Sequence, residues 1–403
     1  MSKNSFLYFL YTSVIVSSSL IFGVIGFSTV EKRDLCASLP DSKRIENEFF
    51  EFTAKTGLNF LQNSNHLFSK SNTEKLEVWA VENQKVRSIN VGVPVKVFKK
   101  VLVDKDNTKW FLTDAGIVSF NGNKWSLHNK NSELKSLYLY GFALETNDKG
   151  EELWTATNGG VAVVKLPFEA EEQIPVFTRE NAAIKSDTIV AVAAGNGPIC
   201  WLGSNRGISA IKADKWLTPS YEDQYPDGIF EFFPILSMAT DNDGDTLYVG
   251  TKGAGVARVF NNDVDGITSA SVYAQWGPIL LPSDTIYSIC IQPNNVKWFG
   301  TDMGVARHTG QNTMDNWTVF TINDGLINNI VQAIAVDNDG KIWFGTQGGI
   351  SVFDGENWKS YSKNDGLISN NVLCITVDKS NIVWIGTDNG VSSLDGSEFV
   401  NYQ

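Results

Sequence analysis

The sequence predicts an all-β fold: a seven-bladed β-propeller of four-stranded antiparallel blades, preceded by a short N-terminal helical segment and an export signal or membrane anchor. The first observation is a repeat whose lead aromatic residues lie 41 to 50 positions apart. A repeat of this length that is made of strands cannot bury its apolar face alone, so each copy must stack on a neighbour. The seven copies are Trp110–Gly116, Trp154–Gly160, Trp201–Gly207, Tyr248–Gly253, Trp298–Gly304, Trp343–Gly349 and Trp384–Gly390.

The sixth repeat shows the expected order of strands within one blade. An apolar run, Val331–Val336, is followed by the turn Asp337–Gly340, in which glycine supplies a positive φ. Two further apolar runs follow at Lys341–Thr346 and Ile350–Phe353, and the aromatic run Asn357–Tyr361 ends the repeat. Four short antiparallel strands joined by tight turns are typical of a propeller blade.

A second aromatic position supports the same register. It lies 15 residues after the lead aromatic in four repeats, at Trp125, Trp216, Trp358 and Phe399. The glycine in the middle of each second strand is expected to allow close backbone approach, and the tryptophan beside it to be buried between sheets. We therefore interpret the Trp-x-Gly-Thr signature as structural and not as a binding site.

The sequence leaves the closure of the ring open. The run Leu76–Val81 resembles a fourth strand that could pair with the last blade and remove an exposed edge. The run Glu398–Tyr402 resembles the same strand of the same blade. Either the N-terminal run adds a fifth strand, or it belongs to a degenerate hairpin that continues through Val91–Val101.

The N-terminal region carries its own signals. Residues 6–27 are almost continuously apolar behind Lys3, which predicts a signal peptide or membrane anchor over residues 1–28, with a possible cut after Ser28. Residues 29–73 are expected to be partly helical, because the apolar positions in residues 41–56 recur at helical spacing. The propeller is expected to occupy residues 74–403, and the membrane to be met only through the N-terminal segment.

Charge and cysteine usage exclude several classes of function. The net charge is −12 and the isoelectric point is about 4.8, without a basic cluster, which argues against nucleic acid as a partner. The spacing of the four cysteines, Cys36, Cys200, Cys290 and Cys374, fits neither a zinc site nor a redox pair. Buried free thiols are the expected state.

Chain direction alternates, so the loops after the second and fourth strands should share one face of the disc. Loops on a rigid scaffold often carry recognition, and polar residues here could form a ring around the channel mouth that binds sugar hydroxyls. The simpler interpretation is that each residue serves turn geometry. The candidate ligand-binding residues are Asn205, Arg206, Asp284, Asp302, Met303, Asn329, Gln347, Asn371, Asp388 and Asn389. Asp114, Asn158, Asp187, Lys252, Asn328 and Asn370 occupy comparable positions.

Catalytic and metal chemistry find little support. The segments Asp241–Gly244 and Asp337–Gly340 resemble the start of a calcium loop but lack its later ligands, so hairpin turns are expected. The three histidines, His66, His128 and His308, lie near no repeated carboxylate pair, and no nucleophile elbow or phosphate loop is present. We expect no cofactor, no metal and no catalytic residue; a hydrolase or lyase would have to use Asp284.

The repeats resemble a known family. The order Asp-Gly-Leu, then Ile-Trp-Phe-Gly-Thr, then Asp-Gly-x-x-Trp stands almost intact at residues 324–361 and 365–399 and is similar to the two-component regulator propeller repeat. The resemblance covers residues 100–403. It implies the sensor region of a hybrid histidine kinase, which often senses glycan fragments. Because the sequence contains one propeller and no kinase segment, we expect an exported, non-catalytic binding propeller, periplasmic, at the cell surface or anchored by residues 6–27. Its partner would be a glycan, another small ligand or an envelope protein; an extracytoplasmic scaffold subunit is the alternative.

Overall fold

The computed structural model describes residues 87–89, 92, 95–128, 138–147, 150–168, 173–194, 199–212, 215–217, 230, 232–242, 244, 246–262, 266–273, 281–310 and 316–403. The chain divides into two compact units, Met1–Asn90 and Val91–Gln403. The first unit contributes the strand β1 (Arg87–Ile89). The predicted signal or anchor, the predicted helix and the run Leu76–Val81 lie outside the described residues. No helix in the described part of the chain has the length and hydropathy needed to cross a bilayer.

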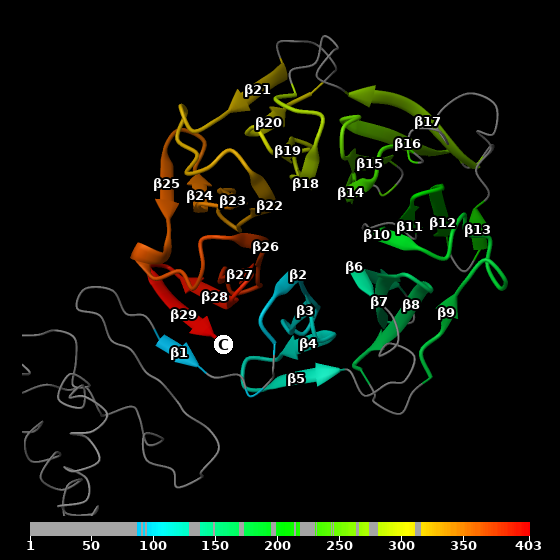
Figure 1. The fold of residues 1–403 in the computed structure, drawn as a ribbon, viewed down its shortest axis with the longest axis horizontal. Helices are drawn as coiled ribbons and strands as arrows, with labels where there is room; N and C mark the ends of the chain where they lie inside the picture. The colour runs from blue at the N-terminus through cyan, green and yellow to red at the C-terminus, as the bar shows by residue number, and fades with distance from the viewer. Residues whose placement is uncertain are drawn as a thin grey trace, which may run out of the picture. The chain divides into compact units, whose positions relative to one another are not determined.

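The second unit is a ring of seven antiparallel sheets, each of which takes four of its strands from this unit (Figure 1). The predicted seven-bladed propeller is therefore confirmed. From the channel outwards, blades 1 to 4 consist of β2 (Phe98–Val103), β3 (Lys109–Thr113), β4 (Ile117–Phe120) and β5 (Trp125–His128); β6 (Leu139–Asn147), β7 (Gly150–Thr157), β8 (Gly160–Leu166) and β9 (Val176–Phe177); β10 (Ile189–Ala194), β11 (Ile199–Ser204), β12 (Gly207–Lys212) and β13 (Lys215–Leu217); β14 (Ile235–Thr240), β15 (Thr246–Thr251), β16 (Val256–Asn262) and β17 (Gly266–Tyr273). Blades 5 to 7 consist of β18 (Ile286–Ile291), β19 (Lys297–Thr301), β20 (Val305–His308) and β21 (Trp317–Phe320); β22 (Val331–Val336), β23 (Ile342–Thr346), β24 (Gly349–Phe353) and β25 (Trp358–Tyr361); β26 (Val372–Val377), β27 (Val383–Thr387), β28 (Gly390–Asp395) and β29 (Glu398–Tyr402). A 3-10 turn, η2 (Lys363–Asp365), joins the last two blades.

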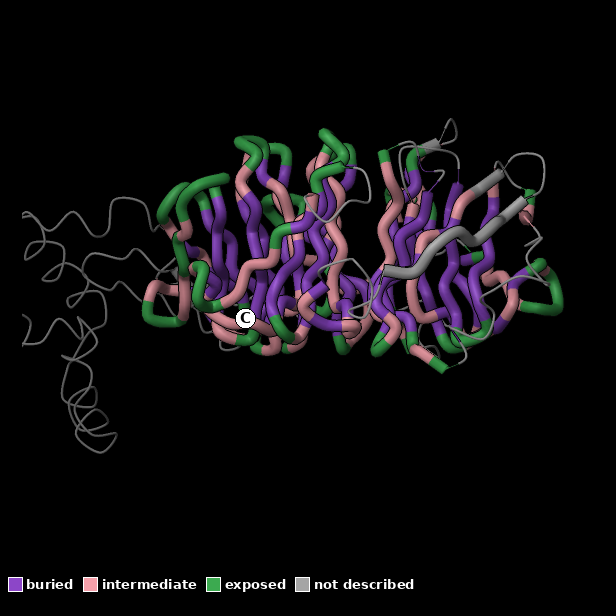
Figure 2. The backbone as a smooth tube through the Cα atoms, turned by 90° about the horizontal axis from the view of Figure 1, so that it is seen from above, coloured by how far each residue is buried: buried purple, intermediate pink, exposed green. Residues whose placement is uncertain are grey.

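The core lies between the blades. The strands run from one flat face of the disc to the other, buried along their middle and exposed at the turns (Figure 2). Second strands such as β19 and β23 are buried at every position, and the lead tryptophans Trp201 and Trp298 have 0% and 2% of their surface exposed. The expectation that these indoles pack between sheets is confirmed.

The threonine of the signature fixes the hairpin between the second and third strands. In blade 6, the Oγ1 of Thr346 donates to the carbonyl of Gly349 (2.8 Å) and accepts from the N–H of Gly348 (3.0 Å). Thr113, Thr157, Ser204, Thr251, Thr301 and Thr387 make the same pair of bonds in the other blades. The signature thus specifies the loop as well as the strand.

The turn between the first and second strands binds the tryptophan. In blade 6, Asp337 Oδ1 accepts from the N–H groups of Asp339 and Lys341, and Asp337 Oδ2 accepts from Trp343 Nε1 (2.9 Å). Asp104 with Trp110 and Asp378 with Trp384 repeat the arrangement. Asp337–Gly340 is therefore a hairpin turn, as expected, whose carboxylate is fully used inside the protein.

Blade 7 meets blade 1 through contacts that also join other blades. The N–H of Gly390 donates to the carbonyl of Lys96 (2.9 Å), as the N–H of Gly304 donates to that of Asn329 (2.8 Å) between blades 5 and 6. β29 is the fourth strand of blade 7. The second unit therefore completes its seven four-stranded blades without a fourth strand from the N-terminal region.

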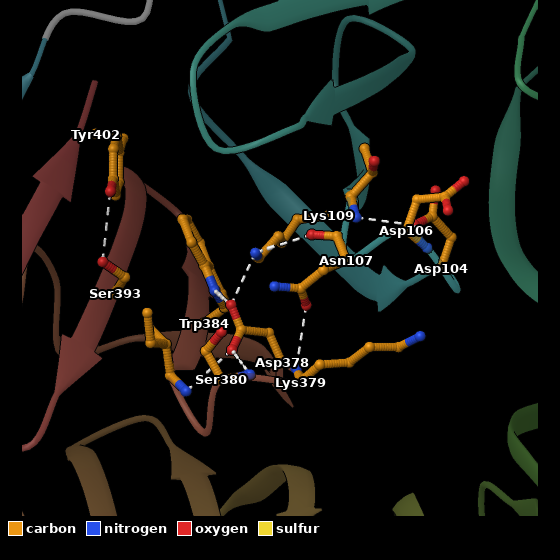
Figure 3. Close-up of polar contacts among 12 residues, drawn as sticks. Asp104, Asp106, Asn107, Lys109, Asp378, Lys379, Ser380, Trp384, Ser393 and Tyr402 are labelled. Carbon is orange, nitrogen blue, oxygen red and sulfur yellow. Dashed lines mark hydrogen bonds and ion pairs between the residues drawn. The ribbon is translucent and has the colours of Figure 1, made fainter.

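A buried ion pair reinforces this closing interface. Lys109 Nζ lies 2.7 Å from Asp378 Oδ2, and the two side chains are 6% and 1% exposed (Figure 3). Burial raises the pKa of Asp378, but hydrogen bonds from Lys109, Trp384 and the N–H of Ile382 outweigh it, so the pKa lies below its ordinary value. The N–H of Lys379 adds a bond to Asn107 Oδ1 (3.0 Å).

Candidate binding face

One face of the disc carries the hairpins between second and third strands and the connections between blades; we call it the loop face. Each inner strand begins there, and its register shifts across its second residue, which marks a β-bulge. A bulge leaves one residue unpaired and re-aims its side chain. The bulged residues are Lys99, Tyr140, Val190, Leu236, Tyr287, Gln332 and Leu373, and all of them are exposed or half-buried.

The predicted hairpin residues lie on this face. Asn205, Arg206, Met303, Gln347 and Asn389 are exposed. Asp302 and Asp388 are half-buried beside them. These seven candidates are therefore available to a ligand approaching the loop face, and their role in binding stays a prediction.

Two candidates at the start of inner strands are also used inside the fold. Asn329 Oδ1 accepts from the N–H of Ile322 (2.9 Å), and its carbonyl accepts from Gly304. The carbonyl of Asp284 accepts from the N–H groups of Gly253 and Gly255, both at 2.9 Å. Both residues join neighbouring segments, which favours the turn interpretation for them.

Asn371 and Asp388 come together in a network at the channel mouth. Asn371 Nδ2 donates to Asp388 Oδ2 (3.0 Å), and Ser369 Oγ donates to Asp388 Oδ1 (2.7 Å). Gln332 Nε2 of blade 6 donates to Asn371 Oδ1 (2.9 Å). Burial raises the pKa of Asp388, but the bonds from Ser369 and Asn371 outweigh it and lower the pKa. The carboxylate is therefore held in its charged form. Sequence reasoning missed Gln332, although it is a polar residue in an otherwise apolar strand.

Asp302 differs from its counterparts. Asp114, at the same hairpin position in blade 1, accepts from the N–H groups of Lys96 and Val97, at 3.3 and 3.2 Å. Asp302 Oδ1 is buried and has no hydrogen-bond partner within the described residues. A buried acceptor without a donor is costly, so Asp302 is not held by the backbone in the way that Asp114 is.

The exposed large apolar side chains of the described residues all lie on the loop face. Tyr138 is 72% exposed and Tyr140 44%, at the start of β6, and Phe232 is 78% exposed before β14. Met303 and Ile322, each 56% exposed, lie on the β19–β20 hairpin and after β21. Apart from Met303, these residues were missed, because an aromatic beside a predicted strand is normally assigned to the core.

The cysteines and His128 of the described residues lie in buried or half-buried positions. Burial raises the pKa of Cys290 and of Cys374 to about 12, and it raises the pKa of Cys200 well above its ordinary value. These three cysteines are free thiols, as expected, although Cys290 is half-buried; Cys36 lies outside the described residues. Burial lowers the pKa of His128 to about 4, so it is neutral at pH 7. No group of three or more His, Cys, Asp or Glu in the described part of the chain could hold a metal.

The comparisons agree with the repeat seen in the sequence. Residues 325–348 and 366–389 match the model of the two component regulator propeller, which confirms the resemblance in the two best-preserved repeats. No curated protein sequence matches the chain.

Solved structures share the fold. An extracellular domain from B. thetaiotaomicron, of a protein assigned to the hybrid two component systems, is 22% identical with a TM-score of 0.59, over 75% of this chain and 39% of that one. A second such domain from the same organism is 19% identical with a TM-score of 0.54, over 76% and 39%. A streptogramin B lyase is 14% identical with a TM-score of 0.57, over 76% and 95%. This chain thus spans less than half of the two-component structures, and at these identities the likeness concerns the fold alone.

Proposed function

We propose that this chain, which carries two-component regulator propeller repeats, is an exported, non-catalytic binding protein that recognises a saccharide through its loop face. The apolar run at residues 6–27 and the extracellular origin of the two similar domains support export. The fold alone permits many functions, so the argument for binding depends on the face itself.

The observation that carries the proposal is the position of the exposed apolar side chains. Single exposed apolar residues are ordinary, but five on the face of the disc that also carries the Asn371–Asp388 network support a recognition surface. Saccharides present both apolar ring faces and hydroxyl groups. Tyr138, Tyr140 and Phe232 can pack against the ring faces. Asp302, Arg206 and Asn371 can hydrogen-bond the hydroxyls.

The test is a screen of oligosaccharides against the full chain by thermal shift, followed by calorimetric titration of the saccharides that stabilise it. Exchange of Tyr140→Ala or Arg206→Ala is expected to weaken binding by about tenfold, the effect of losing one stacking or hydrogen-bonding contact. The melting temperature without ligand should stay unchanged, because both side chains are exposed.

The matched control is Glu356→Ala, an exposed residue in a turn on the opposite face. Equal affinity in Tyr140→Ala, Arg206→Ala and Glu356→Ala would show that the loop face is not the binding surface. If no saccharide stabilises the chain and a pull-down from envelope extracts recovers one stoichiometric protein, the scaffold alternative replaces this proposal. Turnover that survives metal removal and disappears in Asp284→Asn would establish an enzyme.

A further inference from the structure

The inner strands contain few charged residues. Their first six positions form the wall of the central bore and hold two charged residues, Lys99 and Lys100, both in β2. The chain as a whole has a net charge of −12, so two adjacent positive charges on the innermost strand of blade 1 differ in sign from the net charge of the protein. Their presence needs a local explanation.

At the position of Lys100, every other blade has a small residue. Lys100 pairs with Leu112 of β3, which is fully buried. Leu112 occupies the position of the glycine in the Trp-x-Gly-Thr signature. Leu112 is buried in the space between the sheets, whereas Lys100 is exposed although it belongs to the innermost strand of its blade. The residues at the place of Lys100 in blades 2 to 7 are Gly141, Ala191, Ser237, Ser288, Ala333 and Cys374.

The surroundings of the Lys100 ammonium are consistent with this location. Lys100 is exposed to solvent. The protein around its ammonium nevertheless removes part of its hydration, which lowers the pKa of Lys100 below its ordinary value, and the nearby Cys374 opposes this shift. A side chain that reaches solvent from the wall of the bore, with protein around its ammonium, has both properties. Within the described residues, neither Lys99 nor Lys100 forms an ion pair with an acid.

Lys99 places the second charge at the rim. It is the bulged residue of β2, and the bulged residue of the next inner strand, β6, is the exposed Tyr140. The inner strands of blades 1 and 2 are neighbours in the ring (Figure 1). The inner strands of blades 1 and 2 therefore present two ammonium groups, which form no ion pair among the described residues, beside an exposed aromatic side chain.

We propose that Lys99 and Lys100 bind a carboxylate group of the ligand as it enters the bore, and that the ligand is therefore an acidic saccharide, one that contains a uronic acid. This inference rests on the proposed function of the loop face. An ammonium binds a carboxylate by charge-assisted hydrogen bonds, and low-dielectric walls strengthen that attraction. Tyr140 packs against the sugar ring that carries the carboxylate. A neutral sugar would leave both ammonium groups without a counter-charge.

The experiment compares tetragalacturonic acid with its fully methyl-esterified form, which has the same rings but no charge. The full chain is titrated calorimetrically with each ligand. The acid is expected to bind at least about tenfold more tightly than the ester, the effect of one charge-assisted interaction. In the double variant Lys99→Met/Lys100→Met, affinity for the acid should fall by at least about tenfold while affinity for the ester stays unchanged.

The control is Lys124→Met, which removes one positive charge from an exposed turn on the opposite face and should leave both affinities unchanged. The double variant must keep the wild-type melting temperature without ligand; if it does not, Lys99→Met alone, at the exposed rim, gives the comparison. Equal binding of acid and ester by the wild type, or undiminished acid binding by the lysine variants, overturns the inference while the saccharide function stands. No binding of either form, or of any other saccharide, overturns both.

Discussion

Two glycines of blade 6 show how one residue type serves two purposes. Gly349 and Gly355 both have a positive φ, of 124° and 107°. A side chain added at Gly349 would collide with the backbone carbonyl of Tyr361, whereas one added at Gly355 would meet open space. Both glycines therefore satisfy a turn, but only Gly349 also permits close contact between strands.

This difference predicts unequal effects of the same substitution. Gly349→Ala should lower the free energy of unfolding by about 3 kcal/mol or more, since backbone strain and steric collision add. Gly355→Ala introduces backbone strain without a collision, so it should lower the free energy of unfolding by about 1 kcal/mol. Urea denaturation of the two variants measures both values. Equal costs would show that steric contact at Gly349 is unimportant.

At this scale the structural residues that the sequence predicted are confirmed, whereas the binding residues stay a prediction. The Trp-x-Gly-Thr signature repeats, so its structural role could be inferred from pattern alone. The acceptor role of Asp337 toward Trp343 was missed, although three blades share the six-residue spacing between aspartate and tryptophan. Asn329, a predicted binding residue, also accepts a hydrogen bond from the backbone N–H of Ile322 through its side-chain oxygen, which no sequence pattern reveals.

At the scale of elements, an aspartate at the turn between the first and second strands stabilises blades 1, 6 and 7. Its carboxylate orders the turn and binds the indole of the following strand, so one side chain connects turn geometry to packing. Blade 5 uses Gln292 to bind Trp298 instead (3.0 Å). In blade 3, Trp201 Nε1 donates to the carbonyl of Gly244 in the next blade (3.2 Å).

Replacement of this aspartate should therefore be costly. We expect Asp337→Ala to lower the free energy of unfolding by about 2 to 4 kcal/mol, because a buried Trp343 N–H and two turn N–H groups lose their acceptor. Asp339→Ala, in the same turn, removes a side chain that is 61% exposed and should change stability by less than about 0.5 kcal/mol. Chemical denaturation compares them, and similar values for both would contradict the assignment.

Strand order could be predicted from sequence, but the ends of strands could not. The predicted runs of blade 6 agree with β22 to β25, because its turns carry glycine and aspartate at regular places. Blade 2 has an outer strand of two residues, Val176–Phe177, which no periodicity would indicate. The bulges at the start of every inner strand were also missed, since a bulge depends on pairing with a neighbour and not on composition.

At the scale of the whole molecule, ring closure depends on residues that are distant in sequence. Lys109 in blade 1 and Asp378 in blade 7 form a buried pair, which sequence reasoning could not find because nothing local links the two positions. The charged pair also explains why blade 1 carries a lysine where blade 6 carries Ile342. Breaking a buried pair leaves the remaining charge without compensation.

We predict that Lys109→Met and Asp378→Asn each lower the free energy of unfolding by about 3 kcal/mol, and that the double variant loses clearly less than the sum. The sign of the acid dependence follows from the lowered pKa of Asp378: the stabilisation is complete above about pH 4, the ordinary pKa of an unfolded aspartate, and is lost as pH falls through the lower folded pKa. Asp378→Asn should remove that part of the acid dependence.

The control is Lys341→Met, whose partner Asp339 is exposed, with 44% and 61% of the two side chains in solvent. That exchange should cost less than about 1 kcal/mol. Denaturant melts from pH 7 to pH 3 measure all of these variants. Additive losses in the double variant would mean that Lys109 and Asp378 stabilise the ring independently.

The seven bulges have a consequence for how this scaffold can change. Each bulged residue is unpaired and exposed or half-buried, while the residue before it is buried in six of the seven blades. If the loop face binds the ligand as proposed, the residues that select it and the residues that build the core occupy adjacent but separate positions along the chain. A combinatorial library that varies only these seven side chains could alter what the mouth selects without disturbing the cores between the blades, which makes the ring a convenient starting point for engineered receptors.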